Sequence, residues 1–240
     1  MRWLVIIGCV VGAGLGFVAG RVTGGPDEPP APPPVAAEPD GAFAALDPAR
    51  QAELLACDID TAGLSSLLAL DMAAFDQDFS GGWRAVKSRD GCGAAAATVI
   101  EAYLLYSEPY PPSGSLTLLR WHAGQALASD GQYARARAFF AGSYQRPADQ
   151  SASEWNLYVD GTLAFIDRDQ PALQSARDTL AAMPVSDEER TARQAFLDDN
   201  PRISMPDGFV DEPSNLNILD DFIACWDRNY ADAYGRACRH

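Results

Sequence analysis

Signals that begin helices recur along most of this chain, and they constrain its fold more than any other feature of the sequence. Asp47 followed by Pro48 is an N-cap with proline at the first helical position. The strings SASE and SDEE, which begin at Ser151 and Ser186, are capping boxes. From Leu46 onwards apolar residues recur at helical spacing, with little of the alternation that indicates strands. The sequence therefore predicts an all-α fold of about eleven helices without strands.

Apolar stripes indicate which faces of these helices are buried. One stripe is predicted from near-helical spacing and consists of Leu64, Leu67, Leu68, Phe75 and Phe79. A late helix with a second stripe is predicted to begin after Ser214 as its N-cap. Three tryptophans also lie in apolar stripes, so we expect them in the core rather than in a ligand-stacking site: Trp121, Trp155 and Trp226.

Residues 1–23 are predicted to contain a single hydrophobic helix. The uncharged run from Trp3 to Gly20 would span about 27 Å as a helix, close to the roughly 30 Å of a bilayer core. We favour a retained transmembrane anchor, in which glycines four residues apart form a smooth face for another transmembrane helix: Gly8, Gly12, Gly16 and Gly20. A cleaved signal peptide is the main alternative. A lipoprotein signal is a third, although its apolar run would be short.

Residues 24–41 are rich in proline and predict an extended spacer that holds residues 42–240, the helical body, away from the N-terminal helix. Arg2 and the free amine oppose Arg21 alone across the apolar run, which favours an N-terminus inside the cell. We therefore expect a single-pass protein of a bacterial inner membrane with its body in the periplasm. After signal cleavage it would instead be a soluble periplasmic protein.

Four cysteines lie outside the hydrophobic segment, an even number that suits an oxidising compartment: Cys57, Cys92, Cys225 and Cys238. We interpret them as possible disulfide partners, and buried free thiols are the alternative. The sequence does not determine their connectivity. A bridge between Cys225 and Cys238 would require a splayed helix pair if two helices folded back between them.

The chain carries 18 basic and 33 acidic residues, a formal net charge of −15. Such a charge repels nucleic acid and anionic lipid, since phosphate binding depends on basic side chains. We therefore expect no nucleic-acid partner, and a protein or peptide partner that is neutral, cationic or locally basic.

Residues 118–147 and 155–184 share a pattern at an offset of 37 residues, set by Gly124 and Gly161. The run WHAGQALASDGQYARARAFFAGSYQ resembles a tetratricopeptide repeat, well over 118–147, loosely over 155–184 and faintly over 61–111. The resemblance implies helix-turn-helix repeats that stack into a short solenoid with a groove for peptides or proteins. The strings FDQDFSGGWR, WHAGQ and WNLYVDGTLAF also resemble those of uncharacterised bacterial proteins, which implies no function.

Motifs of known chemistry are weak in this sequence. DQDFSGGW matches the start of a calcium loop, but the twelfth position is Lys87 instead of a glutamate. His122 could titrate with Glu101 as its partner, although we favour a partly buried helix histidine. Adjacent acidic residues such as Asp220 and Asp221 are interpreted as solvated surface. We therefore predict no catalytic residues, no metal and no cofactor.

The sequence favours a non-enzymatic, envelope-facing interaction module that binds a peptide or protein in a helical groove. The residues predicted to bind the partner are polar neighbours of the apolar stripes: His122, Gln125, Asn156 and Asp160. One alternative is an all-helical envelope hydrolase or lyase that uses acidic residues such as Asp76 or Asp78. Another is a structural subunit of an envelope assembly.

Overall fold

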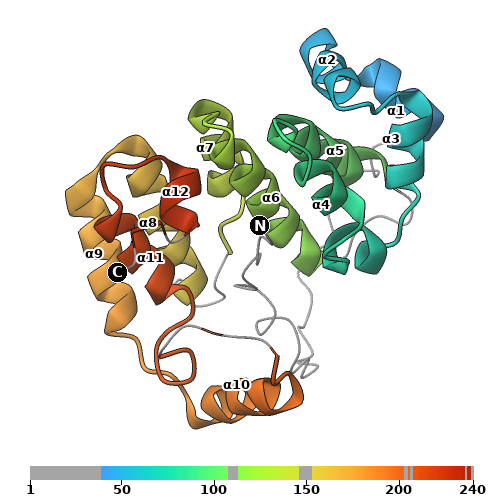
Figure 1. Cartoon of the computed structure of the whole chain (residues 1–240). Coiled ribbons are helices and arrows are strands. Elements are labelled where there is room, and N and C mark those ends of the chain that lie inside the picture. Colours follow the sequence, from blue (N-terminus) through green and yellow to red (C-terminus); the bar gives the residue numbers. More distant parts are fainter. Residues whose placement is uncertain are drawn as a thin grey trace, which may run out of the picture.

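The computed structural model describes residues 39–107, 113–145, 153–202, 205, 208–235 and 237–238. Within these ranges the chain forms twelve α-helices and one π-helix, η1, and no strand, which confirms the predicted all-α fold (Figure 1). The predicted N-terminal helix and residues 24–38 of the predicted spacer lie outside the described residues. Among the helices that are described, none is both long and apolar enough to cross a membrane.

The helices have the following bounds: α1 Pro39–Ala45, α2 Pro48–Ala56, α3 Thr61–Leu68, η1 Ala73–Gln77, α4 Gly82–Lys87, α5 Gly93–Tyr106, α6 Ser113–Ser129, α7 Tyr133–Ala141, α8 Glu154–Asp167, α9 Gln170–Ala181, α10 Asp187–Asp199, α11 Leu216–Ala224 and α12 Tyr230–Tyr234. Helices α5 to α9 pack in succession, each against the next. Helices α1 to α4 pack on α5 or on one another beside it, and α11 packs on α8 and α9. Figure 1 shows α10 set apart from the other helices.

Side-chain caps place several helix starts where the sequence predicts them. The Asp47 carboxylate accepts hydrogen bonds from the Ala49 and Arg50 amides at 2.9 and 3.1 Å. The Ser186 hydroxyl accepts one from the Glu189 amide at 3.1 Å, as its capping box predicts.

Two other predicted caps were wrong. Helix α8 is capped by Ser153, two residues after the predicted serine, and Ser151 lies outside the described residues. The N-cap of α11 is Asn215, whose φ of 66° is a left-handed conformation that asparagine tolerates better than most residues. Ser214 instead accepts a hydrogen bond from Arg193.

Aromatic side chains fill the core where α6, α7 and α8 meet. Trp121 is 1% exposed, and its ring centroid lies 4.6 Å from that of Phe140 and 4.5 Å from that of Tyr158. Trp155 and Trp226 are half-buried against the same core. The tryptophans therefore belong to the core, as predicted.

Gly124 and Gly161, the glycines that align the two repeat-like units, both lie at close helix contacts. A Cβ atom at Gly124 would lie 2.7 Å from the Phe140 ring, and one at Gly161 would lie 2.6 Å from Leu219. The first contact is to α7 and the second is to α11. Small residues are needed at both positions, but they contact different elements.

The stripe predicted to run from Leu64 to Phe79 is interrupted. Helix α3 ends at Leu68, and the chain then forms the π-helix η1, whose wider turn changes the direction in which successive side chains point. Phe75 is fully buried, whereas Phe79 is 52% exposed. The prediction that Phe79 lies in a buried stripe was therefore wrong.

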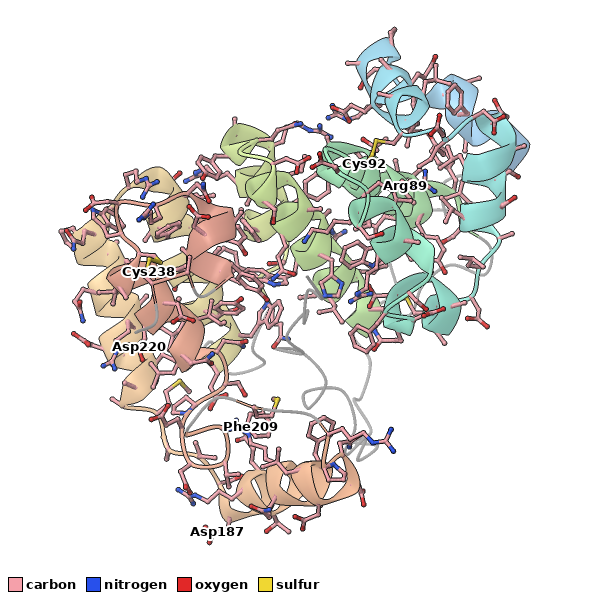
Figure 2. All side chains as sticks on the ribbon, in the orientation of Figure 1. Arg89, Cys92, Asp187, Phe209, Asp220 and Cys238 are labelled. Atoms are coloured by element: carbon pink, nitrogen blue, oxygen red, sulfur yellow. A yellow bond between two sulfur atoms is a disulfide. The ribbon has the colours of Figure 1, made fainter. Side chains whose placement is uncertain are left out.

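Two disulfides close loops in the first and last parts of the described body, and Figure 2 shows both as yellow bonds. Cys57, just after α2, is bonded to Cys92, just before α5. Cys225, just after α11, is bonded to Cys238. We predicted that this bridge would require a splayed pair of helices. It does not, because α12 has only five residues and ends at Tyr234, so Cys238 lies beyond the helix. The chain after α12 brings Cys238 to a Cα–Cα distance of 5.5 Å from Cys225.

A buried arginine ties α10 to the segment that follows it. Arg193 is 1% exposed and donates hydrogen bonds to the carbonyls of Phe209 and Glu212 at 3.0 and 2.5 Å, and also to Ser214 and Glu189. Phe209, labelled in Figure 2, lies beside α10 in this segment. Together with the ion pair between Arg190 and Asp211 at 3.3 Å, these hydrogen bonds hold α10 against the segment that follows it.

Candidate functional site

Two of the strings singled out in the sequence meet in space. FDQDFSGGWR forms η1, the turn after it and the start of α4, and WHAGQ lies on α6. The two are joined by a hydrogen bond of 2.7 Å between Asp76 Oδ1 and His122 Nδ1, across 46 residues of sequence. We call Asp76, Trp83, Arg84, Lys87 and His122 the Asp76–His122 cluster.

Glycine at position 82 lets the chain fold back tightly enough to form this cluster. Gly82 has a φ of +50°, and a Cβ atom there would lie 2.0 Å from the Phe75 carbonyl oxygen. Both the conformation and the backbone contact therefore require glycine. The close approach brings Trp83 and Arg84 against Asp76.

Asp76 is fully buried and surrounded by hydrogen-bond donors. Its Oδ1 accepts from Trp83 Nε1 at 2.8 Å and faces His122 Nδ1, while its Oδ2 accepts from Gln77 Nε2 at 2.6 Å. Arg84 donates to the Asp76 carbonyl, and its Nη1 lies 3.5 Å from Oδ1. Burial would raise the pKa of Asp76, but the hydrogen bonds from His122 and Trp83 and the neighbouring charges lower it below its usual value. Asp76 is therefore a carboxylate at neutral pH.

His122 is 6% exposed, and the Asp76 carboxylate fixes its tautomer. Since that carboxylate only accepts hydrogen bonds, Nδ1 carries the proton and Nε2 carries the lone pair. Within the part of the chain that the structure describes, Nε2 has no hydrogen-bond partner. Burial lowers the pKa of His122 and outweighs the opposing effect of Asp76, and the charges of Arg84 and Lys87 lower it further. The imidazole is therefore neutral at pH 7.

The cations of the cluster lie on α4. The Arg84 guanidinium packs over the Trp83 ring at 4.3 Å and over the exposed Phe79 ring at 5.4 Å. Lys87, the chain's single lysine, is half-buried and makes no hydrogen bond or ion pair with any residue that the structure describes. Burial lowers the pKa of Lys87, Asp130 opposes this, and the Arg84 charge lowers it further.

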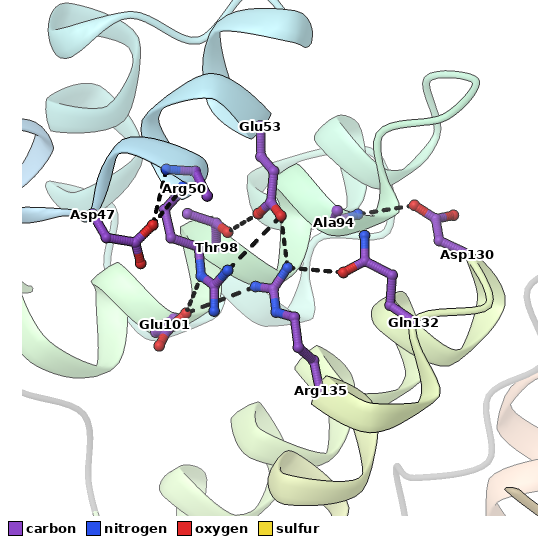
Figure 3. A network of polar contacts seen from close by, with 10 residues as sticks. Asp47, Arg50, Glu53, Ala94, Thr98, Glu101, Asp130, Gln132 and Arg135 are labelled. Carbon is purple, nitrogen blue, oxygen red and sulfur yellow. Dashed lines mark hydrogen bonds and ion pairs between the residues drawn. The ribbon is translucent and has the colours of Figure 1, made fainter.

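Glu101, which sequence reasoning considered as a partner of His122, lies in a different network. Figure 3 shows Glu101 and Glu53 facing two arginines, Arg50 and Arg135. Glu101 Oε2 accepts from Arg50 Nε at 3.3 Å, and Glu53 Oε1 accepts from Arg135 Nη1 at 2.7 Å. This network joins α2, α5 and α7 and does not include His122.

The four predicted partner-binding residues do not form one site. His122 is buried against Asp76, and Gln125, one turn further along α6, is half-buried. Asn156 exchanges hydrogen bonds with the backbone of Gln145 at 2.9 and 2.8 Å. Asp160 is exposed and accepts a hydrogen bond from the Tyr144 hydroxyl at 2.5 Å. Their role in binding stays a prediction.

The acidic residues considered for hydrolysis or calcium binding already have protein partners. Asp76 has no exposed surface with which to contact a substrate. Asp78 Oδ1 accepts from the Ser80 amide and hydroxyl, both at 2.8 Å. The prediction of solvated surface was wrong for Asp221, which is 3% exposed, whereas Asp220 forms an ion pair with Arg177 at 2.7 Å.

Comparison of the chain with protein families, curated proteins and solved structures found no match. The contacts of the Asp76–His122 cluster therefore have to be interpreted from their own chemistry. Sequence reasoning missed this pair because the two residues share no motif. The available signals were the paired glycines before Trp83 and the scarcity of histidine and lysine in the chain.

Proposed function

We propose that this chain is a non-enzymatic interaction module of the bacterial envelope, with a body of tetratricopeptide-like repeats. In this proposal residues 1–23 anchor the protein in the inner membrane with a single pass. Residues 24–41 hold the body away from the membrane on its periplasmic side. The body binds a protein or peptide partner in a groove between its helices.

The succession of helices from α5 to α9 is the observation that carries this proposal. Each helix packs on its predecessor, as the helices of a repeat protein do. Gly124 allows a close contact between α6 and α7, the two helices of the first repeat-like unit, whereas Gly161 allows one between α8 and α11. Surfaces built from successive helix pairs are well suited to extended ligands, because each pair adds a similar strip of surface.

Of the four predicted binding residues Asp160 is exposed, and it lies against the exposed Tyr144, with the half-buried Asn156 one turn earlier on α8. Tyr144 is 38% exposed and holds Asp160 through its hydroxyl. Asn156 holds the backbone of Gln145 beside them. This patch combines an aromatic ring with a carboxylate, which favours a partner that carries a basic or hydrogen-bond-donating group. The net charge of −15 favours the same partner over long distances.

Site-specific photocrosslinking of the full chain in intact cells tests this proposal. The photoreactive benzoylphenylalanine replaces Tyr144 in one variant. In a matched control it replaces Leu55, which is 56% exposed on α2. We expect a discrete protein adduct from position 144 and none from position 55. The absence of an adduct at 144, or the same adducts at both positions, would contradict a partner-binding face on α8.

A further inference from the structure

Helix α10 and residues 208–213 form an arm that stands apart from the other helices (Figure 1). Arg193 of α10 donates hydrogen bonds to the carbonyls of Phe209 and Glu212 at 3.0 and 2.5 Å. The ring centroids of Phe196 and Phe209 lie 6.3 Å apart. These contacts hold α10 and residues 208–213 together as one unit, which we call the α10 arm.

The two ends of the α10 arm start from the same part of the body. The chain enters the arm from α9 and leaves it into α11, and these two helices pack against each other and against α8. Helix α10 itself has no comparable packing on another of the described helices. The arm can therefore change its position without disturbing the core that α8, α9 and α11 form.

Ser214, which follows the arm directly, connects it to α8. Its amide donates a hydrogen bond to Glu154 Oε2 at 3.2 Å, and its hydroxyl accepts one from Arg193 Nη2 at 2.7 Å. The same Nη2 donates to Glu189 Oε1. A continuous chain of contacts thus runs from Glu154 on α8 through Ser214 and Arg193 to Glu189 on α10.

This junction between the arm and α8 contains two carboxylates and one cation. Arg193 contacts Glu189 directly and is connected to Glu154 through Ser214. Burial and repulsion by Glu189 raise the pKa of Glu154 above its ordinary value of 4.5, and they outweigh the opposing effects of Ser214 and Arg193. Helices α7, α9 and α11 also pack on α8, but the charged groups that act on Glu154 belong to α10. The docked arm therefore favours a proton on Glu154.

We propose that Glu154 is a proton-dependent latch: its neutral acid holds the α10 arm against α8, and its carboxylate loosens the arm. When the arm moves away, Glu154 gains water and loses the repulsion of Glu189, so the released state favours the carboxylate. Docking and proton uptake are therefore coupled. The proton's contribution to docking is complete below about pH 4.5 and is lost as the pH rises through the raised pKa of the docked form. The latch acts within the chain and requires no partner.

Distances measured by pulsed electron paramagnetic resonance on the full chain, in neutral detergent micelles, test this latch. Nitroxide labels are attached through p-acetylphenylalanine, which leaves the disulfides intact. One pair of labels replaces Ala195, exposed on α10, and Ser175, exposed on α9. A control pair replaces Ser175 and Ala138, which is exposed on α7. Samples are frozen at intervals between about pH 5 and pH 8, above the ordinary pKa of a glutamate.

We expect one narrow distance between positions 195 and 175 at acid pH and a second population of distances as the pH rises. The ratio of docked to released arms should change by up to about tenfold per pH unit, and the control pair should keep a single distance. Glu154→Gln, a neutral substitute for the acid, should keep the arm docked at every pH. The matched control is Glu188→Gln, which removes an exposed carboxylate from α10 and should respond as the parent chain does.

Two results would overturn the proposal. In the first, the distances between positions 195 and 175 stay the same over the whole pH range, or the second population grows as the pH falls. In the second, the Glu154→Gln chain responds to pH as the parent chain does, which would assign the response to a different group. Because the first result is measured on a chain that retains Glu154, it does not depend on whether the Glu154→Gln variant folds.

Discussion

The two ends of the described body are held together by different chemistry. Around α8, α9, α11 and α12 the core is aromatic: Phe165 stacks on Phe222 at 4.6 Å, and Tyr230 lies 5.5 Å from Phe222. Around η1, α4 and α6 the core buries Asp76 and His122. Each end also has one disulfide.

This difference shows that one core can combine packing that is insensitive to pH with a polar cluster that depends on it. Aromatic packing depends on shape and area, and its free energy changes little with pH. The polar cluster is stable only while each donor meets its acceptor and each group keeps one charge state. We therefore expect the aromatic end to supply more of the stability and the polar end to supply the response to pH.

The largest effect is expected in the aromatic core. Phe222→Ala should lower the free energy of unfolding by about 4 kcal/mol, because Phe222 is fully buried and its loss leaves a cavity. Urea unfolding of the full chain in neutral detergent, followed by circular dichroism, measures this change. Leu55→Ala is the exposed control and should change stability by less than about 0.5 kcal/mol. If both variants lost a similar amount of unfolding free energy, the packing of Phe222 would contribute no more to stability than an exposed side chain does.

The disulfides distinguish the two ends by the length of chain that each closes. Cys57 and Cys92 are 35 residues apart, whereas Cys225 and Cys238 are 13 residues apart. Replacing the first pair by alanine should cost about 4 kcal/mol and replacing the second about 3 kcal/mol, because longer closed loops restrict the unfolded chain more. The same unfolding experiment without reductant measures both. A larger loss for the second pair would contradict this order.

The smallest effect, and the one specific to the polar end, is the pH dependence of stability. The pKa of His122 is lowered from 6.5 in the folded chain, so below pH 6.5 the unfolded chain binds a proton that the folded chain does not. Stability should therefore fall as the pH falls from 6.5 towards the folded pKa, by at most about 1.4 kcal/mol per pH unit. Unfolding free energies measured between about pH 7.5 and 5.5, on both sides of the ordinary histidine pKa, would show this fall in stability.

A comparison of variants isolates the contribution of His122. Burial and the nearby Glu189 raise the pKa of Glu154, which contributes with the opposite sign, since the folded chain then binds the extra proton. His122→Gln should remove the part of the slope due to His122, whereas Phe222→Ala should keep it. If both variants keep the full slope, the pH response belongs to another group.

Local signals in the sequence predicted most of the secondary structure. The caps at Asp47 and Ser186 form hydrogen bonds to amides two or three residues away, so their partners are set by the chain itself. The burial of Trp121 also followed from the spacing of its helix. The prediction failed for Phe79, where a π-helix shifts the register, because no local rule identifies such a turn.

The candidate site was not predictable in this way. His122 was identified as a residue of interest, but its partner was considered to be Glu101, on a neighbouring part of the sequence. The actual partner, Asp76, is 46 residues away, and the two become adjacent because η1 packs on α4, α4 on α5 and α5 on α6. The same is true of Arg193, because three of its acceptors, in Phe209, Glu212 and Ser214, lie 16 to 21 residues further along.

The sequence by itself determined that the described body is helical and which faces of its helices are apolar. These properties depend on hydrogen bonds and periodicity within a few residues. The tertiary structure alone decided that Asp76 faces His122 and that Cys57 pairs with Cys92. Such pairings depend on how whole helices pack, and many packings are compatible with the same local pattern.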